Sequence, residues 1–275
     1  MSRIQQVFAA CKGNNRACLV PYLTAGDPHP KHTVALMHAL VRGGADVIEL
    51  GVPFSDPMAD GPTIQLACER ALNAGTHLRG VLDMVREFRQ QDAQTPVVLM
   101  GYLNPIESMG AERFAEQAAA AGVDGVLAVD LSVEEWDSLQ PALEGQGLDC
   151  IFLMSPTTSL ERAGQMSRYG SGYLYYVSLK GVTGSAALDS VAVASRLAEL
   201  RGTVELPLAV GFGIRTADQV AQVADVADGV VVGSALVQCI ADAASNGDDT
   251  EQMAAKLELA ARELRSGIDR ARQAA

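Results

Sequence analysis

The sequence predicts an α/β fold, a (βα)8 or TIM barrel, and three observations point to it. Eight short apolar or β-branched runs alternate with segments of helical periodicity, which is the pattern of βα units in a parallel sheet. The chain has 275 residues, 48% of them hydrophobic and 20% charged, as one large core would require. No stretch rich in glycine, serine or proline is long enough to divide it. We therefore expect residues 1–275 to form a single barrel domain.

The strands of such a barrel are buried on both faces, so they read as short continuous apolar runs. They are predicted at Cys18–Leu23, Asp46–Leu50, Val97–Gly101, Gly125–Val129, Asp149–Leu153, Tyr173–Val177, Leu208–Val210 and Gly229–Val232. The segments between them repeat apolar residues every three or four positions, which is typical of helices. Helices are predicted at Lys31–Arg42, Leu78–Gln91, Ala111–Ala121, Val133–Leu143, Leu160–Arg168, Ser190–Leu200 and Ala217–Ala224.

Two further helices are expected at the ends of the chain, one before the first strand and a long one from about Thr250. One face of the long helix is apolar and should cover the core, since it carries Met253, Leu257, Leu264 and Ile268. Cations are favoured at a helix C-terminus, and this end of the helix carries Arg265, Arg270 and Arg272.

Composition excludes several classes of protein. The five cysteines are an odd number without a C-x-x-C pair, so we expect reduced, mostly buried thiols and a cytoplasmic location. Residues 1–12 lack the apolar core of a signal peptide, and no apolar run is long enough to span a membrane. A net charge of −12 without a basic cluster argues against nucleic acid and anionic membranes as partners.

Catalytic groups of such barrels gather at the C-terminal ends of the strands, and Glu49 occupies one of these positions. It follows Val47 and Ile48 in an otherwise apolar run. An ionised carboxylate is costly there, and burial raises its pKa, so that a proton stays available near neutral pH. The alternative is that Glu49 lies at the strand end and faces water or an arginine.

Other acidic residues follow strands two and four. Asp56 and Asp60 lie in the loop after the second strand, but Gly61 and Pro62 resemble the start of a helix that would favour a nearby carboxylate without any catalysis. Asp130 follows the fourth strand, and we interpret it as the cap of the helix that comes next.

Glycine turns follow strands six, seven and eight: Gly181–Gly184, Gly211–Gly213 and Gly233 with Ser234 and Ala235. Glycines let backbone N–H groups approach an oxyanion, a helix starting near Ser234 adds its dipole, and barrels often bind phosphate at these loops. The alternative is that the glycines only allow tight turns. Apolar and aromatic residues share the same rim and would hold a flat hydrophobic ligand, although each alone is more typical of a core: Tyr22, Met100, Tyr102, Leu127, Tyr175 and Phe212.

Four motifs resemble the tryptophan synthase alpha chain family: Tyr22–Pro28, Glu49–Gln65, Gly181–Gly184 and Gly211–Ile214. The resemblance extends from about Phe8 to Val237. It implies a retro-aldol cleavage of indole-3-glycerol phosphate into indole and glyceraldehyde 3-phosphate. It further implies a pyridoxal-phosphate (PLP) beta subunit as partner, in an alpha2beta2 heterotetramer, and no cofactor or metal in this chain.

The resemblance also implies roles for single residues. Glu49 would move the protons, Asp60 would accept a hydrogen bond from the indole N–H, and Tyr175 would orient Glu49 or the glycerol. Substrate contacts are expected from Tyr22, Ile64, Met100, Tyr102, Leu127, Tyr175, Thr183 and Phe212. Phosphate contacts are expected from Gly184, Gly213, Gly233 and Ser234, and contacts with the beta subunit from Pro53, Asp56, Pro57 and Asn104.

The sequence departs from the family pattern in two places. Ser132 stands where proline is usual, and Ser185-Ala-Ala187 lacks the arginine that many members carry after the Gly-Val-Thr-Gly motif. These changes concern the closing of the sixth loop as a lid and the communication with the partner.

Other functions are weighed against the lyase. Lys180 could form a Schiff base, but it lies three residues beyond the strand and reads as a solvated lid residue. A metal-dependent aldolase would need a cluster of histidine ligands after a strand, and this sequence has none. The pair His29 and His32 is interpreted as an exposed helix start. The chain could also be mainly an allosteric activating subunit with weak lyase activity, or a free-standing lyase.

Overall fold

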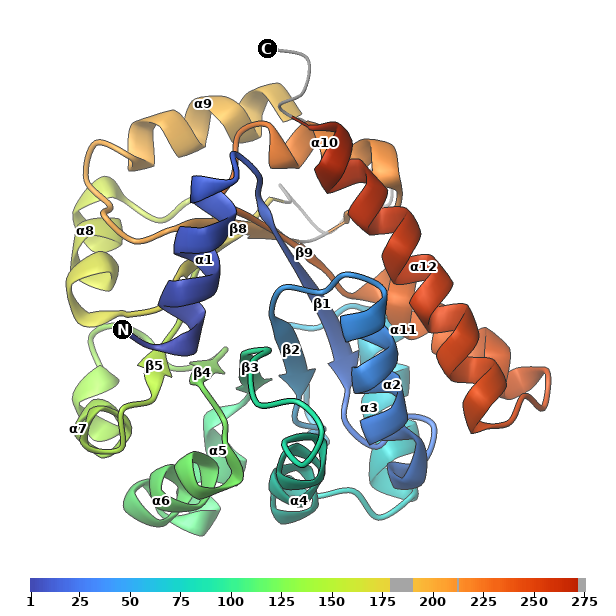
Figure 1. Ribbon diagram of the computed structural model, residues 1–275. Coiled ribbons are helices and arrows are strands. Elements are labelled where there is room, and N and C mark those ends of the chain that lie inside the picture. Colours follow the sequence, from blue (N-terminus) through green and yellow to red (C-terminus); the bar gives the residue numbers. More distant parts are fainter. Residues whose placement is uncertain (179–189, 212, 272–275) are drawn as a thin grey trace.

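The computed structural model describes residues 1–178, 190–211 and 213–271, and in them nine parallel strands form one sheet surrounded by helices (Figure 1). The strands are β1 Cys18–Thr24, β2 Ile48–Gly51, β3 Val97–Gly101, β4 Gly125–Ala128, β5 Asp149–Cys150, β6 Phe152–Met154, β7 Leu174–Val177, β8 Leu208–Gly211 and β9 Gly229–Val232. All pairings are parallel, in the order β5-β4-β3-β2-β1-β9-β8-β7-β6. The predicted α/β class is confirmed.

The sheet closes through its fifth predicted strand, which the structure divides at Ile151 into β5 and β6. The first part pairs with β4 and the second with β7, so the two ends of the strand order are neighbours in the chain. The amide of Ile151 still donates to Val126 O at 2.9 Å. One irregular strand thus completes an eight-stranded barrel.

The helices of the described residues follow the predicted alternation. They are α1 Arg3–Gly13, α2 Pro30–Arg42, α3 Pro62–Asn73, α4 Leu78–Phe88, α5 Leu103–Met109, α6 Ala111–Ala121, the 3-10 turn η1 Trp136–Ser138, α7 Gln140–Gly145, α8 Leu160–Tyr169, α9 Ser190–Leu200, α10 Ala217–Ala224, α11 Ser234–Ser245 and α12 Thr250–Arg270. The short helix α5 was not predicted.

The predicted helix Val133–Leu143 is wrong. The segment instead forms η1 and then α7, with Pro141 in the first turn of α7. Proline lacks the N–H that a continuous helix would need and disfavours helical geometry in the residue before it, so a new helix starts there. Trp136, which is 1% exposed, anchors the turn against Phe152 with ring centroids 4.6 Å apart.

Helix α1 closes one end of the barrel. Its Ile4, Phe8 and Cys11 are buried with interior residues of the strands. Phe8 stacks on Tyr173 with ring centroids 5.4 Å apart. Because α1 covers the N-terminal end, we look for a ligand site at the opposite end, where the strands' C-terminal ends lie.

Helix α12 packs along α2, α10 and α11 on the outside of the barrel (Figure 1). The four apolar residues predicted for its inner face are at most 5% exposed. Arg265 and Arg270 bind Asp46 and Asp218, at 3.3 and 2.9 Å, and Arg272 lies outside the described residues. None of the described helices is both long and apolar enough to cross a membrane.

The histidine pair at the start of α2 is only partly as predicted. His29 is the exposed N-cap of α2, but His32 is 8% exposed and its Nδ1 bonds to Thr250 Oγ1 at 2.7 Å. The expectation of an exposed His32 is wrong because α12 packs over it. The five cysteines are free thiols, four of them buried, as predicted.

Candidate active site

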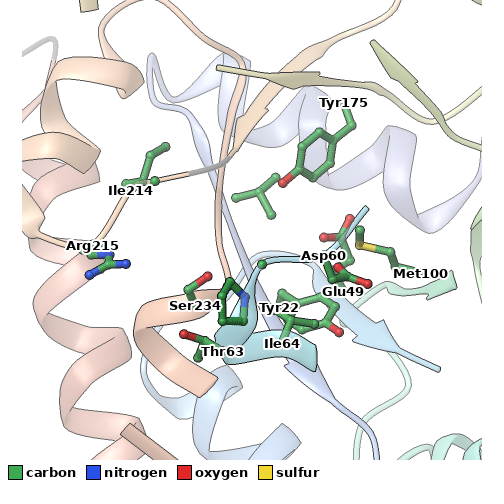
Figure 2. Close-up of a pocket in the computed structure, with 15 residues that line it drawn as sticks. Tyr22, Glu49, Asp60, Thr63, Ile64, Met100, Tyr175, Ile214, Arg215 and Ser234 are labelled. Carbon is green, nitrogen blue, oxygen red and sulfur yellow. The ribbon is translucent and has the colours of Figure 1, made fainter. Parts of the chain in front are cut away.

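A cavity of about 210 Å³ lies at the C-terminal ends of the strands (Figure 2). It contains residues that follow or end six of the strands, far apart in the sequence. From the predicted set the lining includes Tyr22, Glu49, Asp60, Ile64, Met100, Tyr175, Gly213, Gly233 and Ser234. The expected acidic, apolar and glycine-rich features therefore meet in one place.

Glu49 is the buried acid of this cavity. It lies within β2, its residue is 1% exposed, and its Oε1 accepts a hydrogen bond of 3.1 Å from the hydroxyl of Tyr173. Burial is the main cause that raises its pKa to about 8, the charge of Asp60 adds to the rise, and the Tyr173 bond opposes it. The alternative of a carboxylate facing water or an arginine is contradicted by this environment.

Tyr173, which contacts Glu49, is a candidate site residue that sequence reasoning missed. It directly precedes β7, two positions before Tyr175, and the two side chains share the inward face of the barrel. The hydroxyl bonded to Glu49 is that of Tyr173, whereas Tyr175 lines the cavity. The i, i+2 spacing was a signal that both tyrosines point inward.

Two glycines leave space for the tyrosines in the cavity wall. A Cβ on Gly51 would lie 2.1 Å from the hydroxyl oxygen of Tyr22, and a Cβ on Gly211 would lie 2.0 Å from that of Tyr175. Any other residue would force the rings to move. Gly211 belongs to one of the glycine turns expected near phosphate, and in the structure its lack of a side chain leaves room for Tyr175.

Asp60 is the second carboxyl group in the cavity. Its Oδ2 accepts a hydrogen bond of 2.8 Å from the hydroxyl of Tyr102, which in turn accepts one of 3.0 Å from the amide of Ala59. Burial raises the pKa of Asp60, and the bond from Tyr102 opposes the rise. The N-cap of α3 is Gly61, without a side-chain cap, so the carboxyl of Asp60 is bound to Tyr102 instead of capping that helix.

Three predicted residues lie outside the cavity wall. Tyr102 is buried and supports Asp60. Leu127 is fully buried in the barrel interior below the cavity. Asp130 accepts a bond of 2.8 Å from the amide of Leu103, so it caps α5 across the loop, and the prediction that it caps the next helix in the chain is wrong.

The far end of the cavity has the character of an anion site. Gly213 has a φ of +76°, which glycine adopts without strain, and Ser234 begins α11, whose N-cap Gly233 offers no side chain to its first N–H groups. Such free N–H groups attract phosphate. The phosphate contact expected at Gly184 and the substrate contacts expected at Thr183 and Phe212 fall outside the described residues, as does Lys180.

Comparison with known proteins agrees with these observations. A family model described as tryptophan synthase alpha chain matches residues 8–269. The chain belongs to the tryptophan synthase alpha chain family. It is 61% identical over 241 residues to the tryptophan synthase alpha chain of Marinobacter nauticus, covering 88% of this chain and 89% of that one. It is 55% identical over 269 residues to the alpha chain of Alkalilimnicola ehrlichii, covering 98% and 97%.

Solved structures show the same fold as well. The crystal structure of tryptophan synthase subunit alpha from Legionella pneumophila has a TM-score of 0.90 and 47% identity, covering 98% of this chain and 99% of that chain. A structure of tryptophan synthase from M. tuberculosis in an open form has a TM-score of 0.85 and 37% identity, covering 97% and 98%.

The four residues expected to contact a beta subunit differ in exposure. Asp56 and Asn104 are exposed, Pro57 is partly buried, and Pro53 is buried within the chain. A surface groove beside them includes Met58 and Leu66, which are 84% and 54% exposed. The departure Ser132 donates its hydroxyl to Glu135 at 3.1 Å, and it does not line the cavity.

One group of possible metal ligands occurs in the described residues, at the N-terminal end of the barrel. Cys11, Cys18 and Asp46 lie together, remote from the cavity. The carboxylate of Asp46 already accepts two bonds of 2.7 Å from Arg16, one of 2.9 Å from the Leu19 amide and one of 3.3 Å from Arg265. It is thus committed to fold-stabilising partners.

Proposed function

We propose that this chain binds indole-3-glycerol phosphate in the cavity and uses Glu49 and Asp60 to cleave it to indole and glyceraldehyde 3-phosphate. Its family is that of a lyase in tryptophan biosynthesis, and the chain is its alpha subunit. The observation that supports the residue assignment most strongly is Glu49, a buried acid in the cavity wall with a pKa of about 8.

The reaction needs two proton transfers, and one carboxyl group of this kind performs both. Protonated Glu49 gives its proton to C3 of the indole. The carboxylate that results takes the proton of the hydroxyl on the adjacent glycerol carbon, the carbon–carbon bond breaks, and its electrons return to the indole ring as the aldehyde forms. A pKa near the working pH lets the group act first as acid and then as base, which contributes roughly 10² to 10⁴ in rate.

Asp60 stabilises the charge that develops in the ring. When C3 is protonated, the indole nitrogen becomes positive, and a carboxylate that accepts the N–H bond lowers the energy of that state. The bond from Tyr102 favours the ionised form of Asp60. Tyr22, Ile64, Met100 and Tyr175 would hold the ring system, with support from Tyr102 and Leu127 behind the wall and from Thr183 and Phe212 in the adjoining loops.

The phosphate would bind at the opposite end, against Gly213, Gly233, Ser234 and Gly184. Ser234 is the first residue of α11, so the N-terminus of that helix lies at this end of the cavity, and its dipole favours an anion there. With two acids at one end of the cavity and an anion site at the other, indole-3-glycerol phosphate would bind in one orientation, with its indole ring at the acids.

We also propose the partner and setting. A PLP-dependent beta subunit would cover Asp56, Pro57, Asn104 and the exposed Met58 and Leu66, with Pro53 supporting that loop from within. The assembly would be an alpha2beta2 heterotetramer in the cytoplasm, and this chain would act as one barrel domain that itself needs no cofactor. Met58, in the loop that leads to Asp60, and Leu66, on the adjoining helix α3, are exposed apolar side chains of the kind that a protein interface covers.

The test is indole production from indole-3-glycerol phosphate by the purified chain, with and without a beta subunit. Indole formation that the beta subunit accelerates supports the lyase subunit. Full activity of the chain alone would support a free-standing lyase. No cleavage in either case, together with activation of the beta subunit, would leave only the activating role.

A further inference from the structure

The charge of the cavity wall is uneven. Among the described residues that line it, Glu49 and Asp60 are acidic and Arg215 carries the only cation. A phosphate monoester carries a charge of about −1.5 to −2 at neutral pH. The backbone N–H groups of a helix end supply only about half a positive charge, so most of the phosphate charge would lack a counterpart without another cation.

Arg215 lies at the phosphate end of the cavity. Figure 2 shows it on the same side as Ser234 and Thr63, whereas Glu49 and Met100 lie on the other side. The residue is exposed, and within residues 1–178, 190–211 and 213–271 no carboxylate forms an ion pair with its guanidinium. Its charge is therefore available to a ligand.

The backbone of Arg215 is held in place by the start of α10. Gln219 Oε1 accepts a bond of 2.8 Å from the amide of Arg215 and one of 3.2 Å from the amide of Thr216. The hydroxyl of Thr216, the N-cap of α10, accepts from Gln219 N. This capping box fixes the backbone at an arginine that lines the cavity.

We propose that Arg215 binds the phosphate group of the substrate. The proposal rests on the proposed function and adds a specificity residue to it. A guanidinium offers several N–H donors in a planar fork that matches a phosphate, so it supplies both charge and direction.

The test compares two ligands that differ only in the phosphate: indole-3-propanol phosphate, which lacks the hydroxyls needed for cleavage, and indole-3-propanol. The dissociation constants of both are measured by calorimetry for the wild-type chain and for Arg215→Gln, Arg215→Lys and Arg113→Gln. Arg113 is an exposed residue of α6 that does not line the cavity. Arg113→Gln removes the same positive charge as Arg215→Gln, so it controls for the change in net charge. Lys180→Gln tests a cation that lies next to the Gly181–Gly184 turn in the sequence.

We expect Arg215→Gln to raise the dissociation constant of the phosphorylated ligand by at least about fivefold. Hydrogen bonds to charged groups contribute more free energy than exposed ion pairs do. The alcohol should bind as before, Arg215→Lys should recover part of the loss, and Arg113→Gln should behave as wild type. In turnover, Arg215→Gln should raise KM with little change in kcat. A smaller loss, an equal loss with both ligands, or a loss with Lys180→Gln instead would overturn the proposal.

Failure of the proposed function would look different. If wild-type chain and beta subunit release no indole from indole-3-glycerol phosphate, the lyase assignment fails. The binding comparison does not depend on turnover, so it still decides whether Arg215 recognises the phosphate.

Discussion

Replacing Glu49 by glutamine should change how the stability of the chain depends on pH. The carboxyl has a pKa of about 8 when folded and an ordinary value of 4.5. Between these values the folded chain holds a proton that the unfolded chain releases, so the free energy of unfolding falls as pH rises. The gap corresponds to about 5 kcal/mol, at about 1.4 kcal/mol for each pH unit. Glutamine has no proton to lose, so Glu49→Gln lacks this fall.

The measurement is urea unfolding of both proteins at pH 5.5 and 8.5, followed by the fluorescence of the single, buried Trp136. From the lower to the higher pH, Glu49→Gln should gain about 3 kcal/mol relative to wild type. Glu116→Gln, a change at an exposed residue of α6, is the control. Its free energy of unfolding should differ from that of wild type by the same amount at both pH values. A constant difference for Glu49→Gln as well would refute the view that burial keeps this acid protonated.

Further predictions concern the pH profile of kcat/KM, measured with one substrate so that variants can be compared. The profile should fall above about pH 8 as Glu49 loses its proton and fall in acid as Asp60, whose pKa burial raises, gains one. Tyr173→Phe removes a bond that stabilises the Glu49 carboxylate, so its basic limb should move to higher pH; an unchanged limb would contradict the Tyr173 contact. Tyr102→Phe removes the bond to Asp60, so the acid limb should move to higher pH. Asp60→Asn should abolish the acid limb and lower kcat, by less than the loss of Glu49 does. An undiminished kcat would remove Asp60 from the reaction.

The fold could be predicted because its signals are local. Buried parallel strands and amphipathic helices each leave a periodic pattern within a few turns of chain. Helix α5 has no such pattern, because Ile106 is its only buried residue and the helix is only seven residues long. The error at Val133–Leu143 arose because apolar periodicity was weighed above Pro141, which starts a new helix.

The acids could be found from sequence because a charge in an apolar strand conflicts with folding alone. Tyr173, the hydrogen-bond partner of Glu49, could not be found from the sequence. It directly precedes β7, and β2 and β7 are not neighbours in the sheet but meet only across the barrel interior. Which inward tyrosine reaches the acid depends on the stagger of the strands. The same stagger places Leu127 below the cavity, although its position near a strand end suggested the rim.

The most direct test of the central claim is single-turnover indole formation from indole-3-glycerol phosphate by Glu49→Gln bound to a beta subunit. The claim that Glu49 moves the protons predicts a rate at least about 100-fold below wild type, with normal folding and normal binding of the beta subunit. A rate within about tenfold of wild type would contradict it.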